Sequence, residues 1–302
     1  MFYPEEIIFS GTDACNLHCP HCFVSRTPLK LDAEAAVRFI ESAVKYAMET
    51  KSTGSKAGEI SRIGFSGGEP FLYQDFLVKI IKCTVKNDLY FDQIMTNGDW
   101  WKNDRDLRQS LQNIYDAGYD GKIGLSWDSF HGQTPERMEV FLAAVQDIFG
   151  EDSINIQTVI PYNSTPDFYN WLTKTYPEIP VYPLEQSFPS EDERTWQSRK
   201  WFKDDYCEGP GQILYIHPDG NIAPCCGFAN ENPALFIGTI NDSFSTIMEN
   251  AARNKMIDIC YNKGLLNYKK ELKEKKVTFP GKTSDICGFC DYVCKLFTKG
   301  TE

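Results

Sequence analysis

The chain has 302 residues, enough for one large α/β domain with a smaller appendage. Its formal net charge of -11 argues against binding nucleic acid through a basic face, because phosphate contacts need clustered lysine and arginine. The first residues, MFYPEEIIFSG, do not form a signal peptide, and no window approaches the roughly 20 apolar residues of a membrane span. We therefore expect a cytoplasmic protein with no nucleic-acid and no membrane partner.

Short apolar, β-branched runs alternate with helical patterns over residues 1–185, which is typical of repeated β-α units on a parallel sheet. Between the strands, apolar residues recur at spacings of three and four, which predicts five helices. Six units are too few for a closed eight-fold barrel, so the pattern predicts an α/β fold with a partial (β/α)6 TIM-like barrel. The predicted strands are Glu6–Ser10, Ile60–Ser66, Phe91–Thr96, Lys122–Trp127, Ile154–Ile160 and Pro180–Tyr182.

The pattern changes after residue 185. Residues 186–206 are polar and lack a strand period, which predicts a linker across the mouth of the barrel. The run YIHPDGNIAP predicts a hairpin that turns at Pro-Asp-Gly, and two helical segments and a cysteine-rich end follow. We expect a small C-terminal domain over residues 207–302.

Three cysteines, Cys15, Cys19 and Cys22, directly follow the first predicted strand. A loop in that position lies at the carboxyl end of a parallel sheet, where barrel enzymes build their active sites. A cluster of four irons held by three thiolates keeps one iron open, and a cofactor with an amino and a carboxylate group can chelate it. The alternative is a structural zinc loop, which would need a fourth ligand.

The CxxxCxxC spacing resembles that of the radical S-adenosylmethionine (SAM) superfamily. The run Ser66-Gly67-Gly68-Glu69, before Pro70 and after the second strand, resembles the family's GGE motif. This resemblance implies a [4Fe-4S] cluster on the three cysteines and reductive cleavage of SAM to a 5'-deoxyadenosyl radical. It also implies that the methionyl amine is received at the GGE motif, where Glu69 can accept from an ammonium.

Four further residues match cofactor-contacting positions of the family by their order along the chain. His21 holds the position often taken by an aromatic residue beside the adenine. Asn97 after the third strand, and Ser126 or Asp128 after the fourth, resemble the polar positions that contact the ribose and the methionyl carboxylate. For Asn97 and Ser126 the alternative is a helix-capping role.

A second cysteine group begins at Cys207, with Gly220 and Cys225 following in a C-x(9–15)-G-x4-C pattern, and ends with the CxxC of Cys287 and Cys290. This resembles the auxiliary-cluster domains called SPASM and twitch. The shorter, twitch-like version implies four ligands and one auxiliary [4Fe-4S] cluster, so two clusters in the whole chain. Structural zinc is the alternative. Cys226, Cys260 and Cys294 are left without a required ligand role, and Cys83 is expected on a helix.

Cys226 follows Cys225 directly, and neighbouring residues of an extended strand point to opposite faces, so one of the two thiols should be free. Pro-Cys-Cys after a hairpin, with a late Ile-Cys-Gly-x-Cys, resembles radical SAM peptide epimerases. The match implies that Cys226, held over the barrel mouth, is the catalytic hydrogen-atom donor. The alternative is a small buried residue.

The leading hypothesis is therefore epimerisation of a residue in a ribosomally made peptide, with a one-electron donor such as flavodoxin or ferredoxin as partner. The alternatives are epimerisation or dehydrogenation of a sugar or aminoglycoside, and oxidative cross-linking of a peptide. A non-catalytic iron-sulfur electron carrier or redox sensor is a further alternative. Because the first strand begins at once, we expect no peptide-leader-binding domain before it.

Overall fold

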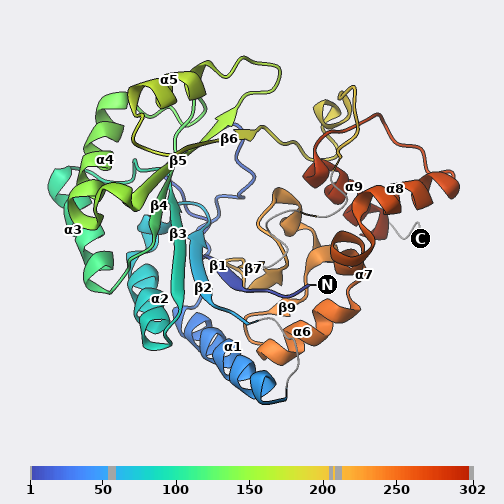
Figure 1. Ribbon diagram of the computed structural model, residues 1–302, viewed down its shortest axis with the longest axis horizontal. Helices are drawn as coiled ribbons and strands as arrows, with labels where there is room; N and C mark the ends of the chain where they lie inside the picture. The colour runs from blue at the N-terminus through green and yellow to red at the C-terminus, as the bar shows by residue number, and fades with distance from the viewer. Residues whose placement is uncertain (1, 54–58, 204–206, 208–212, 299–302) are drawn as a thin grey trace.

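A single curved sheet organises the computed structural model, which describes residues 2–53, 59–203, 207 and 213–298. In this part of the chain the sheet has nine strands in the order β6-β5-β4-β3-β2-β1-β7-β8-β9 (Figure 1). The strands are β1 Glu6–Ser10, β2 Arg62–Ser66, β3 Tyr90–Thr96, β4 Lys122–Ser126, β5 Ile154–Ile160, β6 Val181–Glu185, β7 Ile213–Ile216, β8 Asn221–Ala223 and β9 Gly238–Thr239.

The first six strands are parallel neighbours in chain order, and helices cover their outer face (Figure 1). In β1, Ile7 and Phe9 are fully buried in the core that the sheet forms with these helices, and alternation places Glu6 and Ser10 on the concave face. This open arrangement confirms the predicted α/β fold with a partial barrel. The helices are α1 Ala33–Thr53, α2 Gln74–Lys86, α3 Asp104–Asp116, α4 Pro135–Phe149 and α5 Asp167–Thr175.

The predicted hairpin is confirmed: β7 and β8 pair antiparallel, and Gly220 in the turn has φ 88°. It extends the barrel sheet, because β7 pairs in parallel with β1 and Ile8 lies opposite Tyr215. Since β8 runs back along β7, its carboxyl end points toward the amino ends of β1 and its neighbours. Residues after β8 therefore emerge at the end of the sheet opposite to the Cys15 loop.

The C-terminal helices form a second core and also pack on the barrel. The Phe244 ring, at the start of α6, is fully buried and lies 6.0 Å from Phe39 and 5.2 Å from Tyr46 on α1. Among the described residues, no helix is both long and apolar enough to cross a membrane. The elements are α6 Phe244–Arg253, α7 Lys255–Asp258, the π-helix η7 Ile259–Lys263, α8 Leu265–Glu274 and α9 Ile286–Thr298.

The linker enters this second core. Phe188, Trp196 and Phe202 are each less than a tenth exposed, and Trp196 and Phe202 pack with the residues around α9. The last linker residues, 204–206, lie outside the described part of the chain.

Candidate active site

The Cys15 loop is pinned against the turn that follows β2. The backbone N–H groups of Gly68 and Glu69 donate to the carbonyl oxygens of Thr12 and Ala14, both at 2.8 Å. A Cβ atom on Gly68 would lie 2.3 Å from the Ala14 oxygen. Only glycine therefore allows this approach, which explains why the two motifs meet.

The three cysteines of this loop differ in exposure. Cys15 is half-buried, and its Sγ accepts from the Leu17 N–H at 3.4 Å and the Asn97 amide at 3.6 Å. Burial raises the pKa of the Cys15 thiol. Cys19 is buried, whereas Cys22 is exposed. The structure thus brings Asn97, from the end of β3, to the first cysteine of the loop.

The carboxylate of Glu69 is fully buried and stabilises this motif through hydrogen bonds. It accepts from Phe71 N at 3.1 Å, Thr96 Oγ1 at 2.9 Å and Asn97 N at 2.8 Å. Burial raises the pKa of Glu69 to about 7, while these hydrogen bonds oppose the shift. In this structure the carboxylate ties the turn to the end of β3. The contact of Glu69 with an ammonium stays a prediction, as do the cofactor contacts of Ser66, Gly67 and Gly68.

Asp128 is buried beneath two histidines. It accepts from Phe130 N and His131 Nδ1, both at 2.8 Å, and its second oxygen lies 4.0 Å from His21 Nε2. The rings of His21 and Phe130 are 4.7 Å apart. Burial would lower the pKa of His131, but hydrogen bonds to Asp128 and Cys19 raise it to about 9.

Sequence reasoning missed Phe130 and His131. Both lie in the loop after β4, within three residues of Asp128, and that position was the only signal for them. Ser126 ends β4, and its carbonyl accepts from Gln133 at 3.1 Å. The predicted contacts of Ser126 and Asp128 with the cofactor stay predictions, although Asp128 holds the two histidines in place.

The donor sets fit clusters better than single zinc ions. In the described part of the chain, His21, Asp128 and His131 are the one group of three or more ligand side chains whose atoms all lie within 4.8 Å of one another. A tetrahedral zinc with Zn–S bonds near 2.3 Å needs its sulfurs roughly 3.8 Å apart. Neither cysteine group offers three sulfurs that all lie within 4.8 Å of one another among the described residues, as one zinc ion would need, whereas a cluster distributes its ligands over several irons.

The second cysteine group lines one pocket, which we call the auxiliary pocket. The four predicted ligands are Cys207, Cys225, Cys287 and Cys290, and Cys260 lines the same pocket as a fifth cysteine. Burial raises the pKa of Cys207 to about 12, and these thiols must lose their protons to bind metal. A dry pocket lined with sulfur fits an iron-sulfur cluster.

Cys226 is not among the residues that line the auxiliary pocket, and it is exposed. Surrounding protein nevertheless desolvates the thiol and raises its pKa, and the nearby carboxylates Glu6 and Asp92 raise it further. Glu6 begins β1 and Asp92 lies near the start of β3. The predicted position of Cys226 over the barrel mouth is therefore wrong: the antiparallel course of β8 delivers it to the opposite, amino-terminal end of the barrel.

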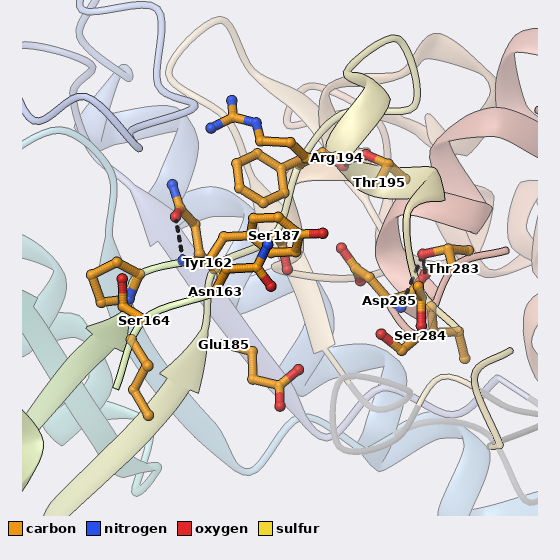
Figure 2. Close-up of a pocket in the computed structure, with 16 residues that line it drawn as sticks. Tyr162, Asn163, Ser164, Glu185, Ser187, Arg194, Thr195, Thr283, Ser284 and Asp285 are labelled. Atoms are coloured by element: carbon orange, nitrogen blue, oxygen red, sulfur yellow. Dashed lines mark hydrogen bonds between the residues drawn. The ribbon is translucent and has the colours of Figure 1, made fainter. Parts of the chain in front are cut away.

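A cavity of about 410 Å³ opens at the carboxyl ends of β5 and β6. Figure 2 shows Tyr162, Asn163 and Glu185 on the barrel side, facing the segment with Thr283, Ser284 and Asp285 across the space. That segment leads directly into Cys287. The cavity therefore lies between the barrel and the segment that begins helix α9, and its walls are both polar and apolar.

Residues 9–153 match the model of the radical SAM superfamily, and residues 207–290 match that of the SPASM iron-sulfur cluster-binding domain. A Bacillus subtilis (strain 168) protein, YydG, described as a peptide biosynthesis protein, is 21% identical over 95% of this chain and 91% of its own.

Two solved structures show weaker likeness. BtrN, in complex with AdoMet and 2-DOIA, has a TM-score of 0.47 at 18% identity, with 86% of this chain and 92% of BtrN covered. Streptococcus suis SuiB, bound to the precursor peptide SuiA, has a TM-score of 0.49 at 11% identity, with 95% of this chain and 76% of SuiB covered.

The family matches cover the Cys15 loop, the GGE motif and the auxiliary pocket, the same places where the described side chains converge. The chain belongs to the radical SAM superfamily and is a radical SAM enzyme with a C-terminal SPASM iron-sulfur cluster-binding domain.

Proposed function

We propose that this enzyme epimerises a residue of a ribosomally made peptide. A [4Fe-4S] cluster held by Cys15, Cys19 and Cys22 would pass one electron from an external donor to bound SAM, giving methionine and a 5'-deoxyadenosyl radical. That radical would remove a Cα hydrogen and leave as 5'-deoxyadenosine. The Cys226 thiol then gives its hydrogen atom to the opposite face of the carbon, which inverts the stereocentre. The resulting thiyl needs one electron and one proton, and an external one-electron donor such as flavodoxin or ferredoxin supplies the electron.

The observation that carries this proposal is the position of Cys226. The Cys15 loop lies at the carboxyl end of the sheet, and Cys226 lies at the amino end beside Glu6 and Asp92. A substrate inside the barrel would therefore have the radical on one side and the thiol on the other. Its raised pKa keeps Cys226 protonated at neutral pH, as a hydrogen-atom donor must be.

The cysteine lining of the auxiliary pocket is evidence for the proposal of a second [4Fe-4S] cluster, bound by Cys207, Cys225, Cys287 and Cys290. Cys226 directly follows Cys225, one of these four ligands, in the sequence. This adjacency suits delivery of an electron to a thiyl on Cys226. The peptide substrate class is supported by the description of the Bacillus subtilis relative. The 410 Å³ cavity at the ends of β5 and β6 offers room for residues that flank the reacting one.

The test compares the wild-type protein with Cys226→Ala after anaerobic cluster reconstitution, in deuterated water, with synthetic peptides encoded beside the gene. We expect the wild type to add one solvent deuterium at an inverted Cα, measured by mass spectrometry and chiral amino-acid analysis. Cys226→Ala should still form 5'-deoxyadenosine but no inverted residue. Cys83→Ala is the matched control, because Cys83 is a buried cysteine on α2, remote from both groups.

Two outcomes would contradict the proposal. A product that loses two hydrogens, with Cys226→Ala still active, would indicate dehydrogenation or peptide cross-linking. Failure of the wild type to form any 5'-deoxyadenosine with SAM and reductant would indicate an iron-sulfur electron carrier instead.

A further inference from the structure

The auxiliary pocket holds one cysteine more than a [4Fe-4S] cluster can bind. Four thiolates close such a cluster, yet Cys260 lines the pocket beside the four predicted ligands. Its Sγ lies 3.8 Å from the Sγ of Cys290, within hydrogen-bonding distance for two sulfur atoms. Cys260 is 3% exposed, so this thiol has no competing contact with bulk water.

A second thiol approaches the same sulfur. Cys294 lies one turn beyond Cys290 on α9 and is fully buried, and residues four apart on a helix lie on the same face. Cys290 is therefore flanked by two cysteines, one from η7 and one from its own helix.

The backbone around Cys260 holds it firmly at this place. Cys260 lies in the π-helix η7, which ends at Gly264 with φ 86°, where the Gly264 N–H donates to Ile259 O at 2.9 Å. The next residue, Tyr261, donates through its hydroxyl to Pro224 O at 2.8 Å. Since Pro224 precedes Cys225, this bond joins the Cys260 segment to another wall of the pocket.

We infer that Cys260 is not a cluster ligand but a positioning residue, whose S–H donates a hydrogen bond to the cluster-ligating thiolate of Cys290. Cys294 donates to the same thiolate. The inference rests on the part of the proposed function that places a cluster on Cys207, Cys225, Cys287 and Cys290.

The sign of the effect follows from charge. A hydrogen bond donated to a ligating thiolate stabilises negative charge, and one-electron reduction adds negative charge to the cluster. Hydrogen bonds to the sulfurs are among the factors that set cluster potentials. Loss of the Cys260 thiol should therefore lower the midpoint potential and leave the cluster in place.

The test isolates the auxiliary cluster in the full-length chain by the substitutions Cys15→Ala, Cys19→Ala and Cys22→Ala. After anaerobic reconstitution we expect about four irons per chain, both with and without Cys260→Ala. In a potentiometric titration followed by EPR, Cys260→Ala should make the cluster about tenfold harder to reduce, a decrease of about 59 mV for a one-electron couple. Cys260→Ser, which keeps a donor, should recover part of the shift, and Cys83→Ala should give none.

Each other result decides against the inference. A fall in iron on Cys260→Ala would make Cys260 a ligand, and an unchanged potential with full iron would make it a packing residue only. If the background protein itself binds no iron, the auxiliary cluster of the proposed function fails as well. That last failure is separate from the first two, because it is seen before Cys260 is altered.

Discussion

Among single residues, Glu6 is a buried carboxyl group on the concave face of the barrel. It is 6% exposed, and its Oε1 has no hydrogen-bond partner among the described residues. Burial, followed by the neighbouring Asp92, raises the pKa of Glu6 from 4.5 to about 7, while Arg62 acts in the opposite direction. The folded protein therefore holds Glu6 largely protonated at slightly acidic pH.

This predicts a pH-dependent stability difference between the wild type and Glu6→Gln. Because the folded pKa lies above the unfolded one, ionisation is penalised only in the folded state, so the wild type loses stability as pH rises from about 4.5 to about 7. Glu6→Gln should not show this decrease in the free energy of unfolding, which amounts to at most about 3 kcal/mol. Urea unfolding of the reduced apoprotein at several pH values measures it. Equal pH slopes for both proteins would contradict the prediction, and Asp92→Asn should make the wild-type slope shallower.

Sequence patterns predicted chemistry-bearing residues best where the spacing itself carries the chemistry. Spacing alone was enough to propose two groups of ligands, Cys15, Cys19 and Cys22 in the first and Cys207, Cys225, Cys287 and Cys290 in the second. The pattern could not place Cys260, because its entry into the pocket depends on a π-helix that packs against a segment far along the chain. The end of the barrel at which Cys226 lies was equally hidden, because it depends on the pairing of β7 with β1.

At the level of elements, the alternation of strand-like and helix-like segments along the sequence predicted where the strands lie, but it did not predict where β6 ends. The predicted strand ended at Tyr182, whereas β6 runs from Val181 to Glu185. Residues 180 and 186 both bond to β5: the carbonyl of Pro180 accepts from the N–H of Ile156, and the N–H of Gln186 donates to the carbonyl of Ile160. Because residues alternate along a strand, the main-chain groups of Pro183 face the free edge of the sheet. A proline is tolerated there because its missing N–H breaks no pairing.

The turn after β2 gives a prediction at this scale. Gly68→Ala would drive a methyl group into the Ala14 carbonyl, 2.3 Å away, and so displace the loop that carries Cys15. We expect reconstituted iron to fall from about eight to about four per chain, because the auxiliary cluster is untouched. Formation of 5'-deoxyadenosine should fall with it.

The control for this prediction is Gly132→Asn. Nothing lies within 4 Å of a Cβ atom at Gly132, and its φ of 71° is one that asparagine tolerates. Full iron and unchanged 5'-deoxyadenosine in Gly68→Ala would show that the loop and the turn are not coupled as the distances indicate.

For the whole molecule, contacts in the sheet and beside α1 are among those that join the C-terminal part to the barrel. Main-chain pairing of β7 with β1 joins them in the sheet, and Phe244 joins them through its contacts with Phe39 and Tyr46. The N–H of Phe244 also donates to Ser42 Oγ at 3.1 Å. Because no barrel strand separates the two parts of this sheet, we expect them to unfold together.

Phe244→Ala tests this coupling. Removing a fully buried phenylalanine should lower the free energy of unfolding by about 3–5 kcal/mol, through lost burial and the cavity left behind. If barrel and C-terminal core form one cooperative unit, thermal unfolding followed by far-UV circular dichroism and by tryptophan fluorescence should shift together. Tyr90→Ala, at a side chain 73% exposed, should change stability by no more than about 0.5 kcal/mol. Two separate transitions in Phe244→Ala, with one at the wild-type temperature, would instead mean that the SPASM domain folds independently of the barrel.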